Sequence, residues 1–187
     1  MLKIDNLTFS YGEKMIFNDF SLEINDGEII WLSGPSGCGK TTLIKLVLGL
    51  LKPQKGKIQT NGMTPSVVFQ ENRLLPFYTV MQNIELVGGD KEKAKDILLA
   101  LGINETANLY PKKLSGGMKR RAAIARALSV DFDLLILDEP FNGIDEKNLE
   151  KTAELINEIC RDKTVIIITH SPIEAELLKA KEVKINN

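Results

Sequence analysis

The spacing of apolar residues changes along the chain, and this change predicts an alternation of strands and helices. Apolar residues occupy near-alternate positions over 2–9 and over 14–24, as they do in half-buried strands. The apolar runs within IIWLSG (29–34), LLILDEP (134–140) and TVIIITH (164–170) are instead typical of strands buried on both faces. Three central, buried strands are therefore predicted.

Helical patterns lie between these strands. The run KTTLIKLVLGLL at 40–51 predicts a buried helix that ends at Pro53, since proline cannot continue a helix. Residues 90–102 predict an amphipathic helix, with Asp90 as its N-cap and Gly102 as its end.

Three more helices are predicted in the second half of the chain. Residues 118–130 are rich in Ala and Arg, which favour helix formation. A helix over about 145–162 separates the two late strands, and the stretch 171–180 carries a capping box formed by Ser171 and Glu174. The remaining elements are short: strands at 56–60, 66–70 and 181–185, and a short helix followed by a loop over 104–117.

Strands that alternate with helices predict an α/β fold built on a mainly parallel sheet. The antiparallel start and the helical middle are additions to it. At 187 residues the chain suits one domain. Its expected parts are an antiparallel β subdomain with core over 1–71, a helical subdomain over about 72–129, and more core over 130–187.

Charge and cysteine content narrow the class of protein. A formal net charge of -1 provides no general attraction to nucleic acid or anionic lipid. Two cysteines make no disulfide framework, and the start of the chain lacks the apolar run of a signal peptide, so a cytosolic location is expected. No stretch approaches the roughly 20 apolar residues of a membrane span.

The segment LSGPSGCGKTTL matches the phosphate-binding loop pattern, in which two glycines separated by four residues precede Lys and Thr. Here they are Gly34 and Gly39, followed by Lys40 and Thr41. A buried strand precedes the segment and a helix follows, so backbone N–H groups and the helix dipole are expected to form an anion nest. The alternative is a glycine-rich turn before a buried helix.

Two carboxylates follow the buried strand within LLILDEP. Ligands of open α/β sheets bind beyond the carboxyl ends of strands. Asp138 is therefore expected to hold Mg²⁺, and Glu139 to polarise the water that attacks a γ-phosphate. The alternative is a solvated acidic strand end.

A second anion-binding helix start is predicted at Ser115, where Ser115 and two glycines stand just before a helix. The first turns of that helix carry Lys119, Arg120 and Arg121, which would add positive charge to the helix dipole. In the alternative interpretation Ser115 only caps the helix.

Together these motifs resemble those of ATP-binding cassette (ABC) ATPases, in the same order and over essentially the whole chain. The resemblance implies a P-loop NTPase core of the RecA type. It also implies a nucleotide-binding set: Tyr11 on the adenine, Gly34, Pro35, Ser36, Gly37, Cys38, Gly39, Lys40, Thr41 and Thr42 in the Walker A loop, Ser115, Gly116 and Gly117 in the signature, and Asp145 in the D-loop.

The resemblance implies catalytic and metal roles as well. Glu139, His170 and Gln70 correspond to the family's catalytic glutamate, switch histidine and Q-loop glutamine. Thr41, Gln70 and Asp138 would hold Mg²⁺. Simpler interpretations remain for single residues: Tyr11 as an ordinary strand aromatic, Gln70 as a solvated polar residue, Asp145 as a helix cap, and His170 as an unremarkable histidine.

The chain departs from the family pattern at Met118, where the signature usually ends in Gln. It also stops soon after His170, which leaves no expected room for a regulatory C-terminal domain.

The resemblance further implies a head-to-tail dimer, either a homodimer or a heterodimer with a related cassette, with ATP at the interface. The first hypothesis is an importer-like subunit, similar to nitrate, sulfonate and taurine ATPases. It would dock through the apolar run at 73–80 on a separate transmembrane permease at the inner face of the membrane. The alternatives are a soluble ABC-type ATPase acting on nucleic acid or the ribosome, and a P-loop kinase. We expect no nucleic acid partner.

Overall fold

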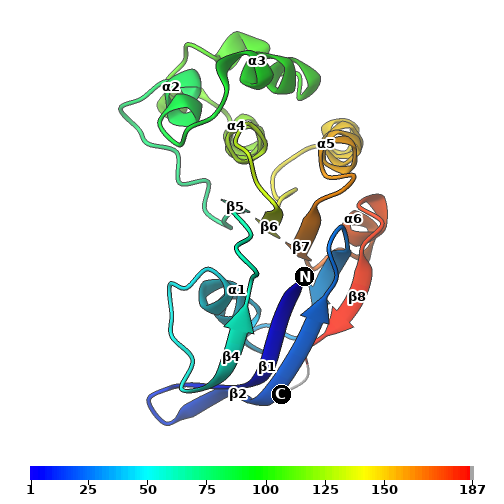
Figure 1. The fold of residues 1–187 in the computed structure, drawn as a ribbon. Helices are drawn as coiled ribbons and strands as arrows, with labels where there is room; N and C mark the ends of the chain where they lie inside the picture. The colour runs from blue at the N-terminus through cyan, green and yellow to red at the C-terminus, as the bar shows by residue number, and fades with distance from the viewer. Residues whose placement is uncertain (186–187) are drawn as a thin grey trace.

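Two sheets of different kinds organise the chain (Figure 1). The computed structural model describes residues 1–185, so the last two residues of the predicted domain lie outside it. The smaller sheet is antiparallel and has the order β2-β1-β4, from Lys14–Ile24, Leu2–Tyr11 and Lys55–Gln59. Gly12, in the tight turn between β1 and β2, has a φ of 57°. The sequence pattern therefore predicted this subdomain correctly.

The larger sheet has five parallel strands in the order β5-β6-β7-β3-β8. These strands are Pro65–Val68, Leu134–Asp138, Thr164–Ile168, Ile29–Ser33 and Lys181–Lys184. Every residue of β6 and β7 is buried, as expected for continuous apolar runs in a central position. The carboxyl ends of these strands meet at one edge, where the site lies.

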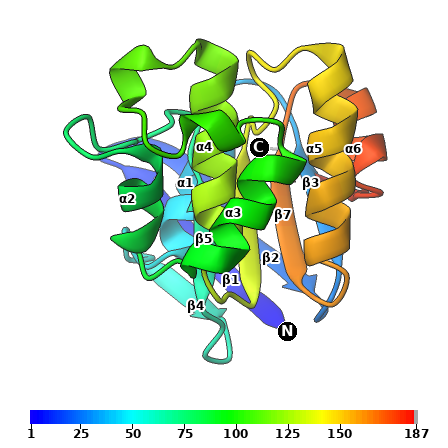
Figure 2. The same cartoon turned by 90° about the horizontal axis from the view of Figure 1, so that it is seen from above.

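Helices cover this framework (Figures 1 and 2). Seen from above, α2 lies on the left, α3 and α4 lie near the middle, and α5 and α6 lie on the right (Figure 2). The helices are α1 Lys40–Val47, α2 Val80–Glu85, α3 Lys91–Ala100, α4 Gly116–Leu128, α5 Glu146–Ile159 and α6 Pro172–Leu177, with 3-10 turns at Asn104–Thr106 and Pro111–Lys113. No helix within residues 1–185 is long and apolar enough to cross a membrane.

Alternate side chains of the central strands serve two cores. Leu135 and Leu137 of β6 pack with apolar residues of α2, α3, α4 and α5. Leu134 and Ile136 point the other way and pack with α1 and the antiparallel sheet. This alternation follows from the two-residue period of a strand. Strand β6 is therefore held between the two cores, one on each of its faces.

The structure differs from the sequence predictions at three helices. The first long helix ends near Leu48, not at Pro53, because Gly49 adopts a left-handed φ of 69° and its N–H donates to the Leu46 carbonyl. Helix α2 was not predicted, although Thr79 and Gln82 form its capping box.

The third correction concerns the predicted capping box at Ser171. The Ser171 hydroxyl accepts a hydrogen bond from the Glu174 N–H at 3.4 Å. The Glu174 carboxylate, however, accepts a hydrogen bond from the Thr169 hydroxyl instead of returning to Ser171. The box is therefore half formed, because a nearby hydroxyl competes for the carboxylate.

Candidate functional site

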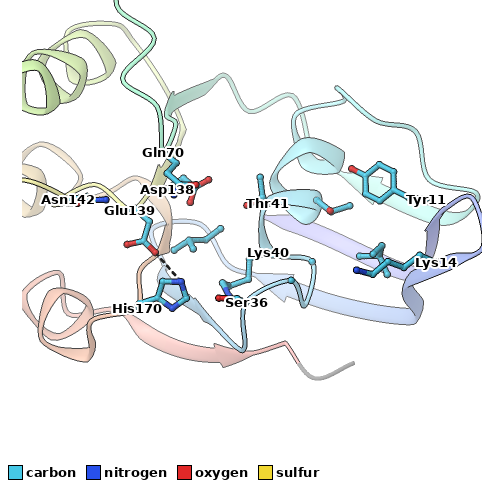
Figure 3. A pocket seen from close by; sticks show the side chains of 15 residues that line it. Tyr11, Lys14, Ser36, Lys40, Thr41, Gln70, Asp138, Glu139, Asn142 and His170 are labelled. Atoms are coloured by element: carbon cyan, nitrogen blue, oxygen red, sulfur yellow. Dashed lines mark ion pairs between the residues drawn. The ribbon is translucent and has the colours of Figure 1, made fainter. Parts of the chain in front are cut away.

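A cleft of about 540 Å³ opens where β3, β6 and β7 end (Figure 3). Five segments line it: the β1–β2 hairpin, the loop that leads into α1, the chain just after β5, the turn after β6, and the turn after β7. Its lining residues are Tyr11, Lys14, Ile16, Ser36, Gly37, Gly39, Lys40, Thr41, Thr42, Gln70, Asp138, Glu139, Asn142, Ile168 and His170. Most of the predicted site residues therefore meet in one place.

Two groups of predicted site residues do not line the cleft. The first belongs to the loop that leads into α1 and consists of Gly34, Pro35 and Cys38. The second belongs to the start of α4 and the turn before α5, and consists of Ser115, Gly116, Gly117 and Asp145. The loop group supports Lys40 directly, whereas the second group is separate from the cleft of its own chain.

The loop before α1 requires glycine at two positions. Gly39 has a φ of 108°, and a Cβ there would lie 2.7 Å from Ile16 Cγ2 and 2.8 Å from Phe17 Cζ. Gly34 has a φ of 144°, and its Cβ would lie 2.7 Å from the Ile185 carbonyl oxygen. Both the backbone conformation and the close packing therefore exclude side chains, so the glycines shape the loop.

The Lys40 ammonium lies inside the curl of this loop. Its Nζ donates to the carbonyl of Gly34 at 2.7 Å and to that of Pro35 at 3.0 Å, and lies 3.8 Å from Cys38 Sγ. Lys40 is buried and is the first residue of α1, so its charge adds to the positive end of the helix. The arrangement suits an anion such as a phosphate group.

Asp138 is the last residue of β6 and is buried. Burial raises the pKa of its carboxyl group, and the positive charges of Arg120 and Lys40 oppose that shift. Asp138 and Thr41 line the same cleft, so a carboxylate and a hydroxyl face one space. Oxygen atoms of this kind are suitable Mg²⁺ ligands.

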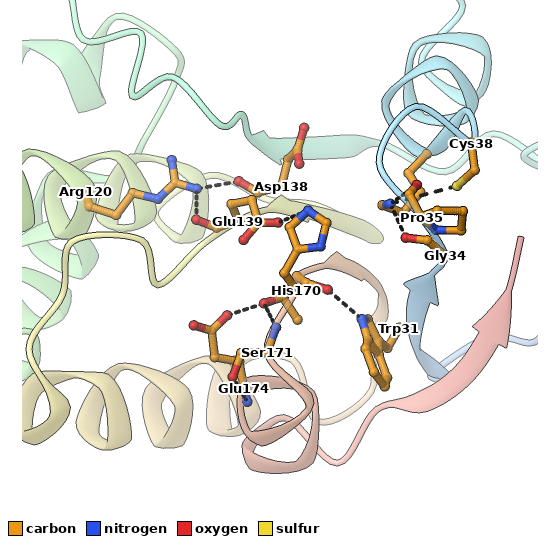
Figure 4. A network of polar contacts seen from close by, with 12 residues as sticks. Trp31, Gly34, Pro35, Cys38, Arg120, Asp138, Glu139, His170, Ser171 and Glu174 are labelled. Atoms are coloured by element: carbon orange, nitrogen blue, oxygen red, sulfur yellow. Dashed lines mark hydrogen bonds and ion pairs between the residues drawn. The ribbon is translucent and has the colours of Figure 1, made fainter.

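Glu139 follows in a left-handed conformation, with a φ of 50°, and its N–H donates to the Ile168 carbonyl at 2.8 Å. Its Oε1 lies 3.6 Å from His170 Nε2 (Figure 4). Burial raises the pKa of Glu139, and His170 opposes the shift. A carboxylate with a raised pKa beside an imidazole is suited to general acid–base chemistry.

The turn that carries His170 is held from two sides (Figure 4). The Trp31 indole N–H donates to the Thr169 carbonyl at 3.0 Å. The Thr169 hydroxyl donates to Glu174 and accepts from the Ser171 N–H. These contacts fix the backbone on both sides of His170.

The start of α4 differs from the predicted cationic anion site. The guanidinium groups of Arg120 and Arg121 are buried, and Arg121 donates to the Leu101 carbonyl at 2.7 Å. The Arg120 guanidinium is likewise occupied by backbone carbonyls. The fold therefore uses these two side chains as internal donors, and the anion site expected at the start of α4 stays a prediction that depends on Ser115 and the first-turn N–H groups.

Both proposed caps are present. The Ser115 hydroxyl accepts from the Met118 N–H at 3.2 Å, and Asp145 Oδ1 accepts from the Asn148 N–H at 3.2 Å. Hydrogen bonds from Asn148 lower the pKa of Asp145. Gly117 packs so tightly that a Cβ would lie 2.6 Å from the Gly143 carbonyl, which joins the start of α4 to the turn before α5.

Sequence reasoning missed Lys14 and Asn142, which also line the cleft. Lys14 pairs with Tyr11 across the β1–β2 hairpin. The tight turn at Gly12 could therefore have indicated that Lys14 lies beside Tyr11. The Asn142 N–H donates to the Glu139 carbonyl at 3.3 Å, within a tight turn that the sequence alone did not indicate.

Comparisons with known proteins agree with this geometry. The family described as ABC transporter matches residues 17–142. A taurine import ATP-binding protein of Yersinia pestis is 39% identical over 97% of this chain and 78% of its own length. An aliphatic sulfonates import ATP-binding protein of Pectobacterium atrosepticum is 39% identical over 93% and 70%.

A solved structure has the same fold. It is a dimeric ATP-binding cassette in a post-hydrolysis state with bound ADP and Pi, with a TM-score of 0.86 and 28% identity, covering 100% of this chain and 94% of the other. The order of the motifs, their meeting in one cleft and these matches lead to one conclusion. The chain belongs to the ABC transporter family, and it is an ATPase.

Proposed function

We propose that this chain powers a membrane importer by binding ATP, closing as a dimer around it, and hydrolysing it. The observation that carries the proposal is the convergence of Lys40, Thr41, Asp138, Glu139 and His170 in one cleft. Relatives named as import ATP-binding proteins support the importer role.

In this proposal the phosphates of ATP occupy the loop before α1. Lys40 would exchange its bonds to the Gly34 and Pro35 carbonyls for contacts with phosphate oxygens. Tyr11 is 46% exposed and packs edge-on against Phe9, with ring centroids 5.0 Å apart, so its ring is available to stack on adenine.

Mg²⁺ fits the donors that the cleft offers. Thr41, Asp138 and Gln70 present a hydroxyl, a carboxylate and an amide to one space. Within the described residues no group of three or more His, Cys, Asp or Glu could hold a metal, so the ion would arrive with the nucleotide and keep phosphate and water oxygens as ligands. When bound, Mg²⁺ neutralises charge on the β- and γ-phosphate oxygens.

Glu139 would accept a proton from the attacking water, and His170 would hold that carboxylate and contact the γ-phosphate. The 3.6 Å separation of their side chains supports this pairing. Gln70, which follows the neighbouring strand β5 and lines the same cleft, would orient the same water.

The position of the signature residues Ser115 and Gly117 supports the proposed dimer. Ser115 and Gly117 do not line the cleft of their own chain, although they present a hydroxyl and free first-turn N–H groups at a helix start. A second cassette would bring this signature to the nucleotide, in a homodimer or with a related chain. Stabilisation of a γ-phosphate in trans is common among NTPases.

The permease would dock on the segment 73–80 beside Gln70. Phe77 is 86% exposed, and Leu75 and Tyr78 are also exposed. Leu74 packs against the core instead, so only part of the run is available. Through this contact the chain would sit at the cytoplasmic face of the membrane. We also propose that 1–187 is one cassette domain, with its helical subdomain over about 72–129.

Co-expression with a permease encoded beside this chain tests the proposal. Phe77→Asp is expected to abolish recovery of the chain with permease-containing membranes while leaving the ATPase activity of the isolated chain unchanged. Leu50→Asp is the control, because Leu50 is 61% exposed but follows the far end of α1. Equal recovery of the Phe77 variant and wild type would contradict the docking surface.

A further inference from the structure

Arg120 occupies an unusual position for a charged residue. It lies in the second turn of α4 and is 2% exposed. Its guanidinium contacts two segments that are distant in the sequence, and Figure 4 shows one of them, at Asp138 and Glu139. A buried charge is costly unless hydrogen bonds compensate it. Its partners therefore indicate why an arginine stands here.

One group of partners belongs to the chain after β5. Arg120 Nη1 donates to the Phe69 carbonyl at 2.5 Å, to the Gln70 carbonyl at 3.2 Å and to Asn72 Oδ1 at 3.3 Å. Arg120 thus holds the carbonyl before the Gln70 Cα and the carbonyl after it, while the Gln70 side chain lines the cleft.

The second group belongs to the turn after β6. Nη2 donates to the carbonyls of Asp138 and of Glu139, the latter at 2.5 Å, and Nε donates to the Pro140 carbonyl at 3.0 Å. These contacts support the left-handed conformation of Glu139 from behind. All of these acceptors are neutral oxygens.

The guanidinium remains charged in this setting. Burial lowers the pKa of Arg120 to about 10, which is still well above neutral pH. The planar fork can donate in several directions from one rigid group, which a lysine ammonium on a flexible stem cannot reproduce.

We propose that Arg120 is a positioning residue that locks the Gln70 segment and the Asp138–Pro140 turn into one unit, and so fixes Gln70 relative to Glu139. This inference rests on the catalytic roles proposed above for Gln70 and Glu139. A misplacement of about 1 Å can cost on the order of 100-fold in rate, so a fixed separation matters.

A second arginine of α4 extends the same unit. Arg126 donates to the Arg73 carbonyl at 2.7 Å and to the Asn72 carbonyl at 3.2 Å, and the Arg73 guanidinium lies 3.8 Å from the centre of the Phe69 ring. The helix that begins with Ser115 therefore holds both the catalytic turn and the start of the docking segment. A shift of that segment would reach the catalytic turn through α4.

The test compares Arg120→Lys and Arg120→Met with the wild type. We expect kcat to fall at least about tenfold in Arg120→Lys and about 100-fold in Arg120→Met, as for lost orientation. The Kd of a fluorescent ATP analogue is expected to stay within about threefold, because neither the phosphate loop nor Tyr11 contacts Arg120. Arg161→Lys and Arg161→Met, at an exposed arginine, are the matched controls.

A double-mutant cycle separates positioning from general destabilisation. If Arg120 acts through Gln70, the combined Arg120→Lys, Gln70→Ala variant loses less kcat than the product of the two single losses. Should Arg120→Met fail to fold, Arg120→Lys and the cycle still decide. The inference would be overturned if Arg120→Lys had the kcat of the wild type. It would also be overturned if the kcat losses of the two single variants simply multiplied in the double variant and each loss of kcat matched a fall in melting temperature. Normal turnover in Glu139→Gln would instead overturn the proposed catalytic assignment, whatever the Arg120 variants do.

Discussion

Replacing Glu139 by Gln removes one negative charge while keeping the size and a hydrogen-bonding head. The carboxylate oxygen Oε1 of Glu139 lies 3.6 Å from His170 Nε2, and Glu139 lines the cleft. Loss of general-base assistance typically costs about 10²–10⁴ in rate, so we expect kcat to fall at least about 100-fold. That fall corresponds to roughly 2.7 kcal/mol of transition-state stabilisation.

The same substitution is expected to stabilise the folded chain. Burial raises the pKa of Glu139 above its unfolded value, so at neutral pH the ionised carboxylate is less favourable in the folded state than in the unfolded state. Nearby Glu174 and Asp138 add repulsion. A neutral Gln removes both the cost of burying the charge and this repulsion, so the melting temperature of the variant is expected to rise.

Steady-state phosphate release and thermal unfolding, measured on the same preparations, give both quantities. In the wild type kcat should also decline as the pH falls through the raised pKa of Glu139, above the ordinary 4.5 of a glutamate, because the base becomes protonated. Glu150→Gln, at an exposed position of α5, is the control. A variant of Glu139 that turns over within about threefold of wild type would refute the assignment.

Four further substitutions test other parts of the site. Trp31→Phe leaves the buried Thr169 carbonyl without its indole donor and should lower stability by about 1–3 kcal/mol, measured by urea unfolding, with a kcat loss larger than any change in KM. Ser115→Ala should lower kcat about ten- to 100-fold with unchanged ATP affinity in the monomer, whereas Met118→Gln should change kcat less than about threefold in the same assay. Gly39→Ala should abolish binding of a fluorescent ATP analogue, because its Cβ would lie 2.7 Å from a neighbouring side chain; normal binding would contradict the loop argument.

Several features of this protein were determined by short stretches of sequence. The left-handed backbone of Gly39, the place of Lys40 at the start of α1, and the caps at Asp90 and Asp145 all depend on backbone angles and hydrogen bonds within a few residues. Such local interactions need no knowledge of distant contacts. The period of apolar residues likewise predicted the central strands, because burial on both faces requires an unbroken apolar run.

Some local signals were present but outweighed or overlooked. Gly49 ends α1 before Pro53 can act, and Thr79 with Gln82 forms a capping box at a helix of only six residues. The Ser171 box is only half formed, since the Thr169 hydroxyl donates to the Glu174 carboxylate that would have closed it. Which of two nearby donors binds a carboxylate depends on where the side chains lie, and the sequence does not give that position.

Only the tertiary structure decided the roles of the α4 arginines. Their position after the signature suggests an anion site, yet Arg120 and Arg121 turn inward because α4 packs against α3, α5 and the end of β6. Carbonyls left free by irregular turns after β5 and β6 provide the acceptors for Arg120. The approach of Glu139 to His170 likewise depends on β6 and β7 being neighbours, since strand order brings residues together that no local spacing relates.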